Sequence, residues 1–144
     1  AESMRNGFAA ADPASVIVCV HDGVRPLVTV DEIERTVDSA VHNAAACLVA
    51  PVTDTIKTVD YGKITGTIDR GTLRRALTPQ AFRYGILRDA LENAELSESV
   101  TDECLLVENI GVVVTTVEGR ARNIKITHAE DLILAEAFLR EESK

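Results

Sequence analysis

Aromatic residues are scarce in this sequence: phenylalanine and tyrosine make up 3% of its 144 residues, and tryptophan is absent. The apolar residues are mainly valine, leucine, isoleucine and alanine, which favour an aliphatic core such as a buried parallel sheet covered by helices. A chain of this length can bury roughly two thirds of the surface that it exposes when unfolded. No composition shift marks an internal boundary, so we expect residues 1–144 to belong to one α/β domain.

An excess of positive charge is also missing. The formal net charge is −8 and no run of lysine and arginine occurs, which removes the clustered cations on which binding to nucleic acid or anionic membranes relies. No stretch approaches the roughly 20 apolar residues of a membrane helix. We therefore expect neither nucleic acid nor a membrane as a partner, and a cytoplasmic location.

Cysteines are few and do not suggest a disulfide framework. Cys19, Cys47 and Cys104 are odd in number and widely spaced. At least two of them lie inside apolar runs. The pattern therefore predicts buried free thiols in a reducing compartment.

Two apolar runs of strand length, at 15–20 and 47–52, flank a helical pattern. The helix is expected to begin at a capping box formed by Thr29 and Glu32. Together these segments predict a β-α-β unit, with two paired parallel strands and a right-handed crossover. The first run reads as a central, buried strand.

Residues 55–59 and 63–68 mix threonine, isoleucine and valine with polar residues, and Asp60, Tyr61 and Gly62 join them. This is the pattern of a β-hairpin with a glycine turn. An isolated hairpin is marginally stable in water. We therefore expect the hairpin to pack on another surface, and a second copy of the chain is the economical candidate.

The remaining pattern completes an open α/β sheet. A helix is expected at 82–94, another from Thr101 to a stop at Gly111, and a strand at 112–117. A second capping box, Thr127 to Glu130, predicts a last helix. The apolar stripe of that helix is Leu132, Ala135 and Leu139.

Ligands of open α/β sheets bind beyond the carboxyl ends of the strands, and Asp22 and Arg25 directly follow the first strand. An aspartate there can hold a metal ion or a sugar hydroxyl. The alternative is that Asp22 caps the turn while Arg25 pairs with a carboxylate. The residues alone leave both interpretations open.

Other polar residues supply hydroxyls and cations, which are the donors that a phosphate monoester needs. Thr55 and Arg70 flank the hairpin, where a solvated polar surface is the alternative. Thr78 lies in a polar segment of the kind that often carries function. Lys125 lies in an expected short strand at 124–126, where we expect it to face a pocket. The alternative is that it is an ordinary surface lysine.

Several other chemistries lack their motifs. Residues 66–72 have the residue spacing of a phosphate-binding loop, except that Thr72 occupies the position of the required lysine. Dinucleotide-binding, serine-hydrolase and Cys-x-x-Cys motifs are absent from the sequence. The three histidines have no metal-ligand spacing, so a zinc site has little support.

Six segments, taken in order, closely resemble the 2-C-methyl-D-erythritol 4-phosphate cytidylyltransferase family. They are VHDGVRP at 20–26, PVTDTIK at 51–57, TIDR at 67–70, TPQAF at 78–82, VTDE at 100–103 and VEGRARNIKIT at 117–127. The resemblance extends from about residue 2 to the last helix. Each segment is a weak signal alone, but six in register are a strong one.

The resemblance implies a Rossmann-like nucleotidyltransferase sheet with helices on both faces and a protruding hairpin, an arm over about 54–71, that builds a homodimer. The implied reaction transfers a cytidylyl group from CTP to 2-C-methyl-D-erythritol 4-phosphate and releases pyrophosphate, in the non-mevalonate route to isoprenoids. Mg²⁺ assists the transfer. The partners implied are small phosphorylated substrates and a second copy of the chain.

The resemblance also implies roles for single residues. Asp22 and Lys125 are expected to be catalytic, with Asp22 also a candidate metal ligand. The expected substrate-binding residues are Arg25, Thr55, Arg70, Thr78 and Thr101, and Ser3 is expected near the cytidine. Thr55 and Arg70 would reach the site of the partner subunit from the arm.

The sequence departs from the family in two places. The family's first strand and its glycine-rich loop, with an essential arginine and lysine, have no match here. We therefore expect this chain to be a C-terminal part that is inactive alone. The family's aromatic residue before Thr78 is also missing from 73–77, so the contacts at the base of the arm are expected to differ from those of the family.

The sequence is also compatible with two other functions. A ribitol 5-phosphate cytidylyltransferase shares the fold and several motifs. A module for dimerisation or binding, without catalysis, could have kept the acceptor pocket. A glycine-rich loop with arginine and lysine upstream of the chain would favour an enzyme over such a module.

Overall fold

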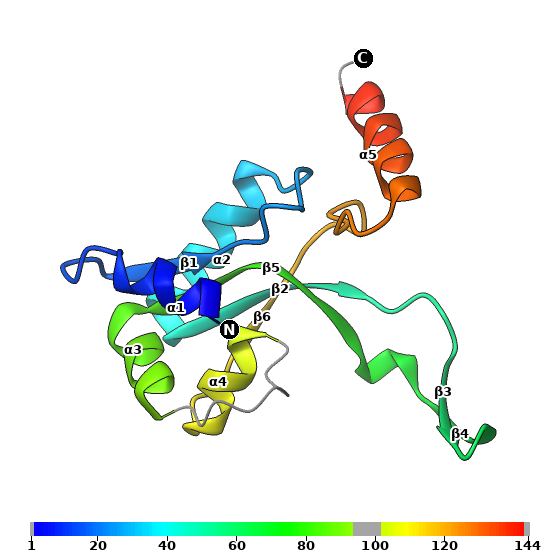
Figure 1. Cartoon of the computed structure of the whole chain (residues 1–144), viewed down its shortest axis with the longest axis horizontal. Helices are drawn as coiled ribbons and strands as arrows, with labels where there is room; N and C mark the ends of the chain where they lie inside the picture. Colours follow the sequence, from blue (N-terminus) through cyan, green and yellow to red (C-terminus); the bar gives the residue numbers. More distant parts are fainter. Residues whose placement is uncertain (1, 94–101, 143–144) are drawn as a thin grey trace.

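A computed structural model describes residues 2–93 and 102–142 of the chain. Its helices are α1 (Glu2–Ala9), α2 (Val30–Asn43), the short 3₁₀ turn η1 (Arg70–Thr72), α3 (Tyr84–Asn93), α4 (Glu103–Asn109) and α5 (Ala129–Glu142). Its strands are β1 (Ile17–Val20), β2 (Ala45–Pro51), β3 (Ile56–Asp60), β4 (Lys63–Ile68), β5 (Arg74–Arg83) and β6 (Thr115–Glu118). Figure 1 shows a central sheet, an arm formed by β3 and β4, and α5 standing away from the sheet.

The central sheet has four strands in the order β1-β5-β2-β6. β5 is antiparallel to both β1 and β2, while β2 and β6 are parallel. β1 and β2 therefore run in the same direction, but they do not pair, and the expectation of an adjacent parallel pair was wrong. In the described part of the chain β1 is also an edge strand and is half-buried, whereas we expected a central, buried strand.

β5 occupies the place that the sequence pattern gave to a loop and the start of a helix. Pro79 argues against a central strand because it cannot donate to the ladder. The pairing of β5 with β2 shifts register between Cys47 and Val49, whose partners are Gln80 and Ala76. This irregularity leaves Pro79 outside the regular ladder. Phe82 consequently belongs to β5, and α3 begins two residues later than expected.

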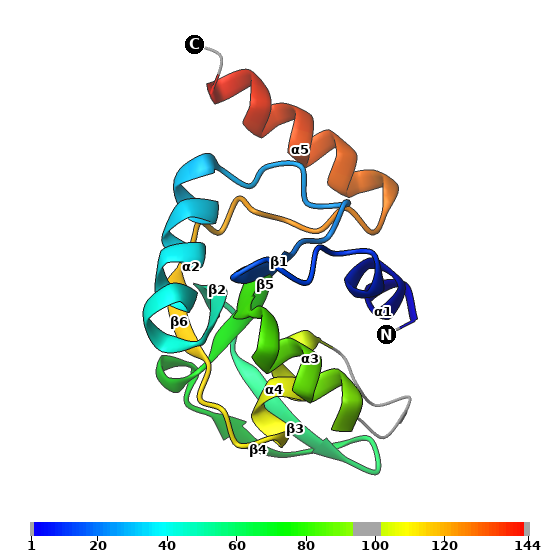
Figure 2. The same cartoon turned by 90° about the vertical axis from the view of Figure 1, so that its left-hand side faces the viewer.

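Alternate residues of β2 face two different helical layers. Ala45 and Cys47 pack with residues of α3 and α4, whereas Ala46 packs with Ala40 of α2 on the opposite face. Figure 2 shows α2 on one side of the sheet and α3 with α4 on the other. Helices cover both faces, as expected, and the fold is a mixed α/β arrangement.

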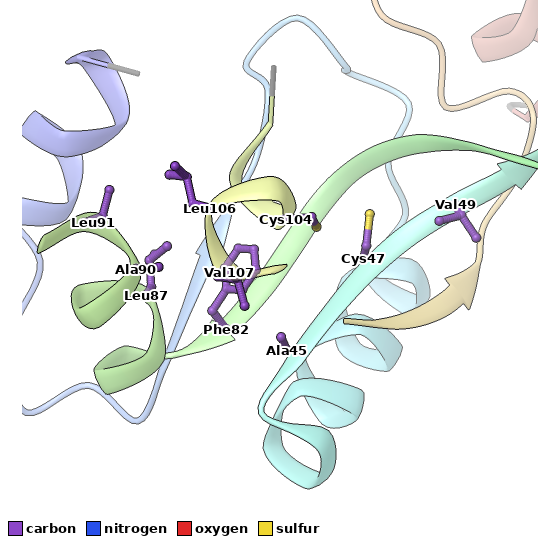
Figure 3. Close-up of a cluster of buried hydrophobic side chains, with 10 residues drawn as sticks. All are labelled: Ala45, Cys47, Val49, Phe82, Leu87, Ala90, Leu91, Cys104, Leu106 and Val107. Carbon is purple, nitrogen blue, oxygen red and sulfur yellow. The ribbon is translucent and has the colours of Figure 1, made fainter. Parts of the chain in front are cut away.

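The main hydrophobic core lies between the sheet and the α3–α4 layer. Figure 3 shows its ten buried residues, which come from β2, β5, α3 and α4. Cys47 and Cys104 are free and buried in this core, as expected. Cys19 is also free but is exposed, contrary to the expectation of a buried thiol.

The hairpin is confirmed at the expected place. Tyr61 and Gly62 form the turn between β3 and β4 with positive φ angles of 44° and 75°, as a two-residue turn between antiparallel strands requires. Val59, Tyr61 and Ile64 are 62%, 98% and 68% exposed. The arm therefore presents apolar side chains to solvent.

Helix termini agree only partly with expectation. Thr29 and Glu32 form the expected capping box of α2. At α5 the acid that accepts from the main chain is Asp131, which takes bonds of 2.8 Å from the amides of both Thr127 and His128, and the expected box with Glu130 was wrong. The aspartate stands at the third helical position, where such an acid reaches the unpaired amides.

The apolar stripe of α5 is only partly buried. Leu132 and Leu139 are 53% and 47% exposed, and Ala135 alone of the three is buried. Gly111 follows α4 with a φ of 80°, consistent with the expected helix stop. The expected strand at 124–126 is an extended loop instead.

No helix in the described ranges, 2–93 and 102–142, is long and apolar enough to cross a membrane.

Candidate functional site

Asp22 lies just after β1, and two cations share one oxygen of its carboxylate. Arg25 Nε is 3.0 Å and Lys125 Nζ is 3.3 Å from Oδ2. The side chains of Asp22 and Lys125 are 32% and 48% exposed, and that of Arg25 is 11% exposed. The three charges form a cluster that is open to ligands on the side of Asp22 and Lys125.

Arg25 is fixed in place by the main chain. Its amide donates to the carbonyl oxygen of Asp22 at 3.0 Å, which closes a turn. Its Nη1 donates to the carbonyl oxygen of Asn123 at 2.9 Å. The guanidinium therefore connects the segment after β1 with the segment that carries Lys125. The two sequence-based interpretations of Asp22 are compatible, because it pairs with Arg25 and still faces a cavity.

Thr78 brings β5 into the same cluster. Its hydroxyl oxygen accepts from the amide of Asp22 at 3.0 Å and lies 3.0 Å from Nδ1 of His21. Nε2 of His21 lies 3.2 Å from the carbonyl oxygen of Arg25. Because a carbonyl only accepts, a neutral His21 carries its proton on Nε2, and Thr78 then donates to Nδ1.

Asn123 is a residue of this network that sequence reasoning missed. It is fully buried, and its Nδ2 donates to the carbonyl oxygen of Thr78 at 2.9 Å. Its Oδ1 has no hydrogen-bond partner within the described residues. The only signal in the sequence is that Asn123 lies in the segment at 117–127 that carries Lys125.

A second buried network holds the loop before α2 against the end of β6. Glu32 is fully buried, and its Oε1 accepts from the amide of Arg120 at 2.7 Å. Nη2 of Arg120 donates to the carbonyl oxygen of Leu27 at 2.8 Å. Glu32 was expected only to cap α2, but it also orients the chain that leads into the Lys125 segment.

The carboxylates of the site differ in acidity. Partial burial raises the pKa of Asp22, but the hydrogen bonds and charges of Arg25 and Lys125 outweigh it, so that this pKa lies below its ordinary value. Burial, followed by the charges of Asp102 and Asp22, raises the pKa of Glu103. Asp22 is therefore held ionised.

Two cavities meet at this cluster. The larger, about 590 Å³, is lined by Ser3, Asp22 and Glu103, together with residues of α1 and β1. The smaller, about 200 Å³, is lined by Arg25, Thr78 and Lys125. Asp22 and Glu103 line both cavities. A ligand in each cavity would have its reactive end beside Asp22.

The structure brings five of the expected site residues together. Asp22, Arg25, Thr78 and Lys125 line the smaller cavity, and Ser3 reaches the larger one. The two arm residues are not part of this group. Thr55 and Arg70 line neither cavity, Nη1 of Arg70 bonds to the carbonyl oxygen of Thr53, and Thr101 lies outside the described residues.

The protein groups near Asp22 do not make a metal centre by themselves. Over 2–93 and 102–142, no group of three or more histidine, cysteine, aspartate or glutamate residues could hold a metal ion. However, both cations contact Oδ2 of Asp22, which leaves Oδ1 for a further ligand. Mg²⁺ is commonly held by one or two carboxylates together with substrate phosphates, so the donor set fits Mg²⁺ only with a bound phosphate.

The arrangement as a whole is suited to phosphorylated ligands. Arg25 and Lys125 offer directed and mobile cationic donors respectively. Asp22 provides an anionic oxygen between the two cavities. Such a site can hold two phosphate-bearing molecules in fixed mutual orientation.

Comparisons with known proteins agree with this chemistry. The family model described as IspD: 2-C-methyl-D-erythritol 4-phosphate cytidylyltransferase matches residues 1–141. Curated proteins of the same description are 44% identical over 144 residues in Geobacter metallireducens and 49% identical over 140 residues in Syntrophotalea carbinolica. These matches cover 97% and 96% of this chain but only 62% and 60% of those proteins. The chain thus spans about three fifths of these curated relatives.

Solved structures of the same family are also similar to this chain. The 4-diphosphocytidyl-2C-methyl-D-erythritol synthase of Anaerococcus prevotii is 34% identical, with a TM-score of 0.87 over 96% of this chain and 65% of that one. The 2-C-methyl-D-erythritol 4-phosphate cytidylyltransferase of Thermus thermophilus is also 34% identical, with a TM-score of 0.82 over 96% and 68%. With sequence, fold and site in agreement, the chain belongs to the 2-C-methyl-D-erythritol 4-phosphate cytidylyltransferase family.

Proposed function

We propose that the protein that carries this chain transfers a cytidylyl group from CTP to 2-C-methyl-D-erythritol 4-phosphate and releases pyrophosphate. The observation that carries the proposal is the convergence of Arg25 and Lys125 on one oxygen of Asp22, where two cavities meet. The larger cavity, with Ser3, is assigned to the nucleotide. The smaller cavity is assigned to the acceptor.

In this reaction an oxygen of the acceptor phosphate attacks the α-phosphorus of CTP. A new phosphorus–oxygen bond forms while the bond from the α-phosphorus to the bridging oxygen breaks, and pyrophosphate leaves with the electron pair. The acceptor phosphate is largely ionised at neutral pH, since its second pKa is about 6. No side chain has to remove a proton, so positioning and charge neutralisation supply the catalysis.

Each residue of the cluster has its own part in positioning or in charge neutralisation. Lys125 lies on the exposed side of Asp22 and can neutralise charge that develops on the transferring phosphoryl group. Arg25, anchored on the main chain of Asn123, holds Asp22 in a fixed orientation. Oδ1 of Asp22 would hold Mg²⁺ together with substrate phosphates, and the ion would add positive charge at the reacting phosphates.

The proposal includes a homodimer that shares its active sites. Thr55 and Arg70 lie on the arm and do not line the cavities of their own subunit. Their assigned role in binding the acceptor phosphate therefore requires the site of a partner subunit. The exposed apolar side chains of the arm, Val59, Tyr61 and Ile64, give it a surface for that partner.

Two further parts of the proposal concern the whole protein. The 144 residues hold no glycine-rich loop with arginine and lysine for the triphosphate, so we propose that they do not turn over CTP alone. The free thiols of the chain agree with the reducing cytoplasm as its location.

The test is an assay of pyrophosphate release and of the cytidine diphosphate product by the protein that carries this chain. CTP and Mg²⁺ are supplied with either 2-C-methyl-D-erythritol 4-phosphate or ribitol 5-phosphate. Conversion of the first acceptor with a clear preference in kcat/KM supports the proposal. Preference for ribitol 5-phosphate would replace it with the related reaction, and turnover of neither would favour a module without catalysis.

A further inference from the structure

Glu103 lies where the two cavities meet. The proposed reaction gives its carboxylate no role. It is the first residue of α4, and with Asp22 it lines both the larger and the smaller cavity. It is partly buried. Its position is therefore inside the site, but it takes no part in the Arg25–Asp22–Lys125 cluster.

The backbone around Glu103 is held firmly. Oδ1 of Asp102 caps α4 by accepting from the amide of Leu105 at 3.0 Å. The amide of Cys104 donates to Oε1 of Gln80, a buried residue of β5, at 3.1 Å. These bonds fix the main chain on both sides of Glu103, so the direction in which its side chain enters the cavities is set by the fold.

The neighbours of Glu103 do not satisfy its charge. Within the described residues its carboxylate has no ion-pair partner. Burial and, to a smaller extent, the charges of Asp102 and Asp22 raise its pKa, and a hydrogen bond from its own main chain offsets only part of this rise. Asp102 already serves as a helix cap. A carboxylate kept in such a place at a cost in stability is a candidate for ligand recognition.

The smaller cavity has walls of opposite charge. Arg25 and Lys125 supply cations, whereas carboxylates come from Glu103, the first residue of α4, and from Asp102, its N-cap. An anionic ligand group is attracted to the cationic wall and repelled by the acidic wall. Hydroxyl groups, in contrast, are good donors to a carboxylate. The ligand class that fits both walls has one phosphate and several hydroxyls, as a polyol phosphate does.

We propose that Glu103 accepts hydrogen bonds from the hydroxyl groups of the acceptor and so selects a polyol chain over other phosphate monoesters. This inference rests on the proposed function and deepens it, because it names the group that recognises the hydroxylated end of the acceptor. Glu103 is then a specificity-determining residue. The cations recognise the phosphate, and Glu103 recognises what the phosphate is attached to.

The test compares a hydroxylated ligand with one that has only the phosphate. The protein that carries this chain is assayed with CTP and 2-C-methyl-D-erythritol 4-phosphate, and n-butyl phosphate is added as an inhibitor that lacks hydroxyls. Glu103→Ala is compared with Glu108→Ala, an exposed glutamate on the same helix. Glu103→Gln serves as a second variant that keeps the volume of the side chain.

In Glu103→Ala we expect KM for the acceptor to rise about tenfold or more, because hydrogen bonds to a charged group are lost. KM for CTP and the inhibition constant of n-butyl phosphate should change less than about threefold. Glu103→Gln should raise the acceptor KM by a smaller factor, and Glu108→Ala should resemble the wild type.

Two outcomes would overturn the inference alone. One is an acceptor KM that stays within about twofold of wild type in both Glu103 variants. The other is an equal rise for the acceptor and for n-butyl phosphate, which would mean that Glu103 only maintains the shape of the site. A wild-type protein that converts no polyol phosphate would instead remove the proposed function, and the inference with it.

Discussion

Asn123 donates a hydrogen bond of 2.9 Å from Nδ2 to the carbonyl oxygen of Thr78, which lies 45 positions earlier in the sequence. The carbonyl oxygen of Asn123 itself accepts from Arg25. One buried amide residue thus connects the β5 residue that binds the Asp22 amide with the arginine that binds the Asp22 carboxylate. The geometry of Asp22 depends on a residue that does not touch it.

Replacing Asn123 with alanine should therefore cost stability. A buried carbonyl left without its donor costs about 1–3 kcal/mol, and we expect a loss of that size in the free energy of unfolding measured by urea denaturation. Asn43→Ala removes a side-chain to main-chain bond at an exposed position of α2, and should change stability by less than about 0.5 kcal/mol. Equal effects of the two variants would contradict the role given to Asn123.

The stability that Asp22 contributes to the fold should be lost in acid. Its pKa is lowered in the folded chain, so the stability that it contributes is present above the unfolded pKa of about 3.9 and is lost as the pH falls through the folded value. Asp22→Asn should be less stable than wild type at pH 7, and the gap should close below about pH 4. Unfolding curves from pH 3 to pH 7 would measure this. A gap independent of pH would exclude a charge effect.

Glu103 should act in the opposite direction over the same pH range. Because its pKa is raised in the folded chain, its favourable contribution is present below the unfolded pKa of about 4.3 and is lost as the pH rises. Glu103→Gln should therefore be more stable than wild type at pH 7 and equal to it near pH 3. A variant that is less stable at pH 7 would show that the carboxylate is well satisfied in the folded state.

Much of the fold was predictable because local patterns agree with it. The capping box of Thr29 and Glu32, the turn of Tyr61 and Gly62 and the stop at Gly111 all occur as expected. Each depends on residues close together in the sequence. The position of Asp22 after the first strand was predictable for the same reason.

The errors come from contacts between distant residues. The polar residues around Pro79 suggested a loop, but the register shift opposite Cys47 and Val49 accommodates the proline within β5. β5 then separates β1 from β2, which no local pattern of those strands indicates. Asn123 and Glu103 were missed as site residues because their positions in the site depend on how distant strands and helices pack together.

The shared active site of the proposed homodimer can be tested by mixing subunits. Asp22→Asn and Arg70→Ala should each be nearly inactive alone, since every site lacks one residue. Mixed dimers pair the intact arm of one subunit with the intact Asp22 of the other. Random exchange should restore about a quarter of wild-type activity, because half of the dimers are mixed and each has one intact site. If mixing restores no activity while subunit exchange is demonstrated, Arg70 serves its own subunit or none.

The central proposal is that the Arg25–Asp22–Lys125 cluster is the reacting centre for cytidylyl transfer. Lys125 tests the claim most directly, because it lies on the exposed side of Asp22 at 3.3 Å and has no other ion-pair partner within the described residues. The measurement is kcat for pyrophosphate release from CTP with 2-C-methyl-D-erythritol 4-phosphate, in Lys125→Ala and in Arg140→Ala, which removes a cation of α5 that is 80% exposed and lines neither cavity. We expect Lys125→Ala to lower kcat by about 100-fold or more and Arg140→Ala to leave it nearly unchanged. A Lys125→Ala variant within about threefold of wild type would contradict the account.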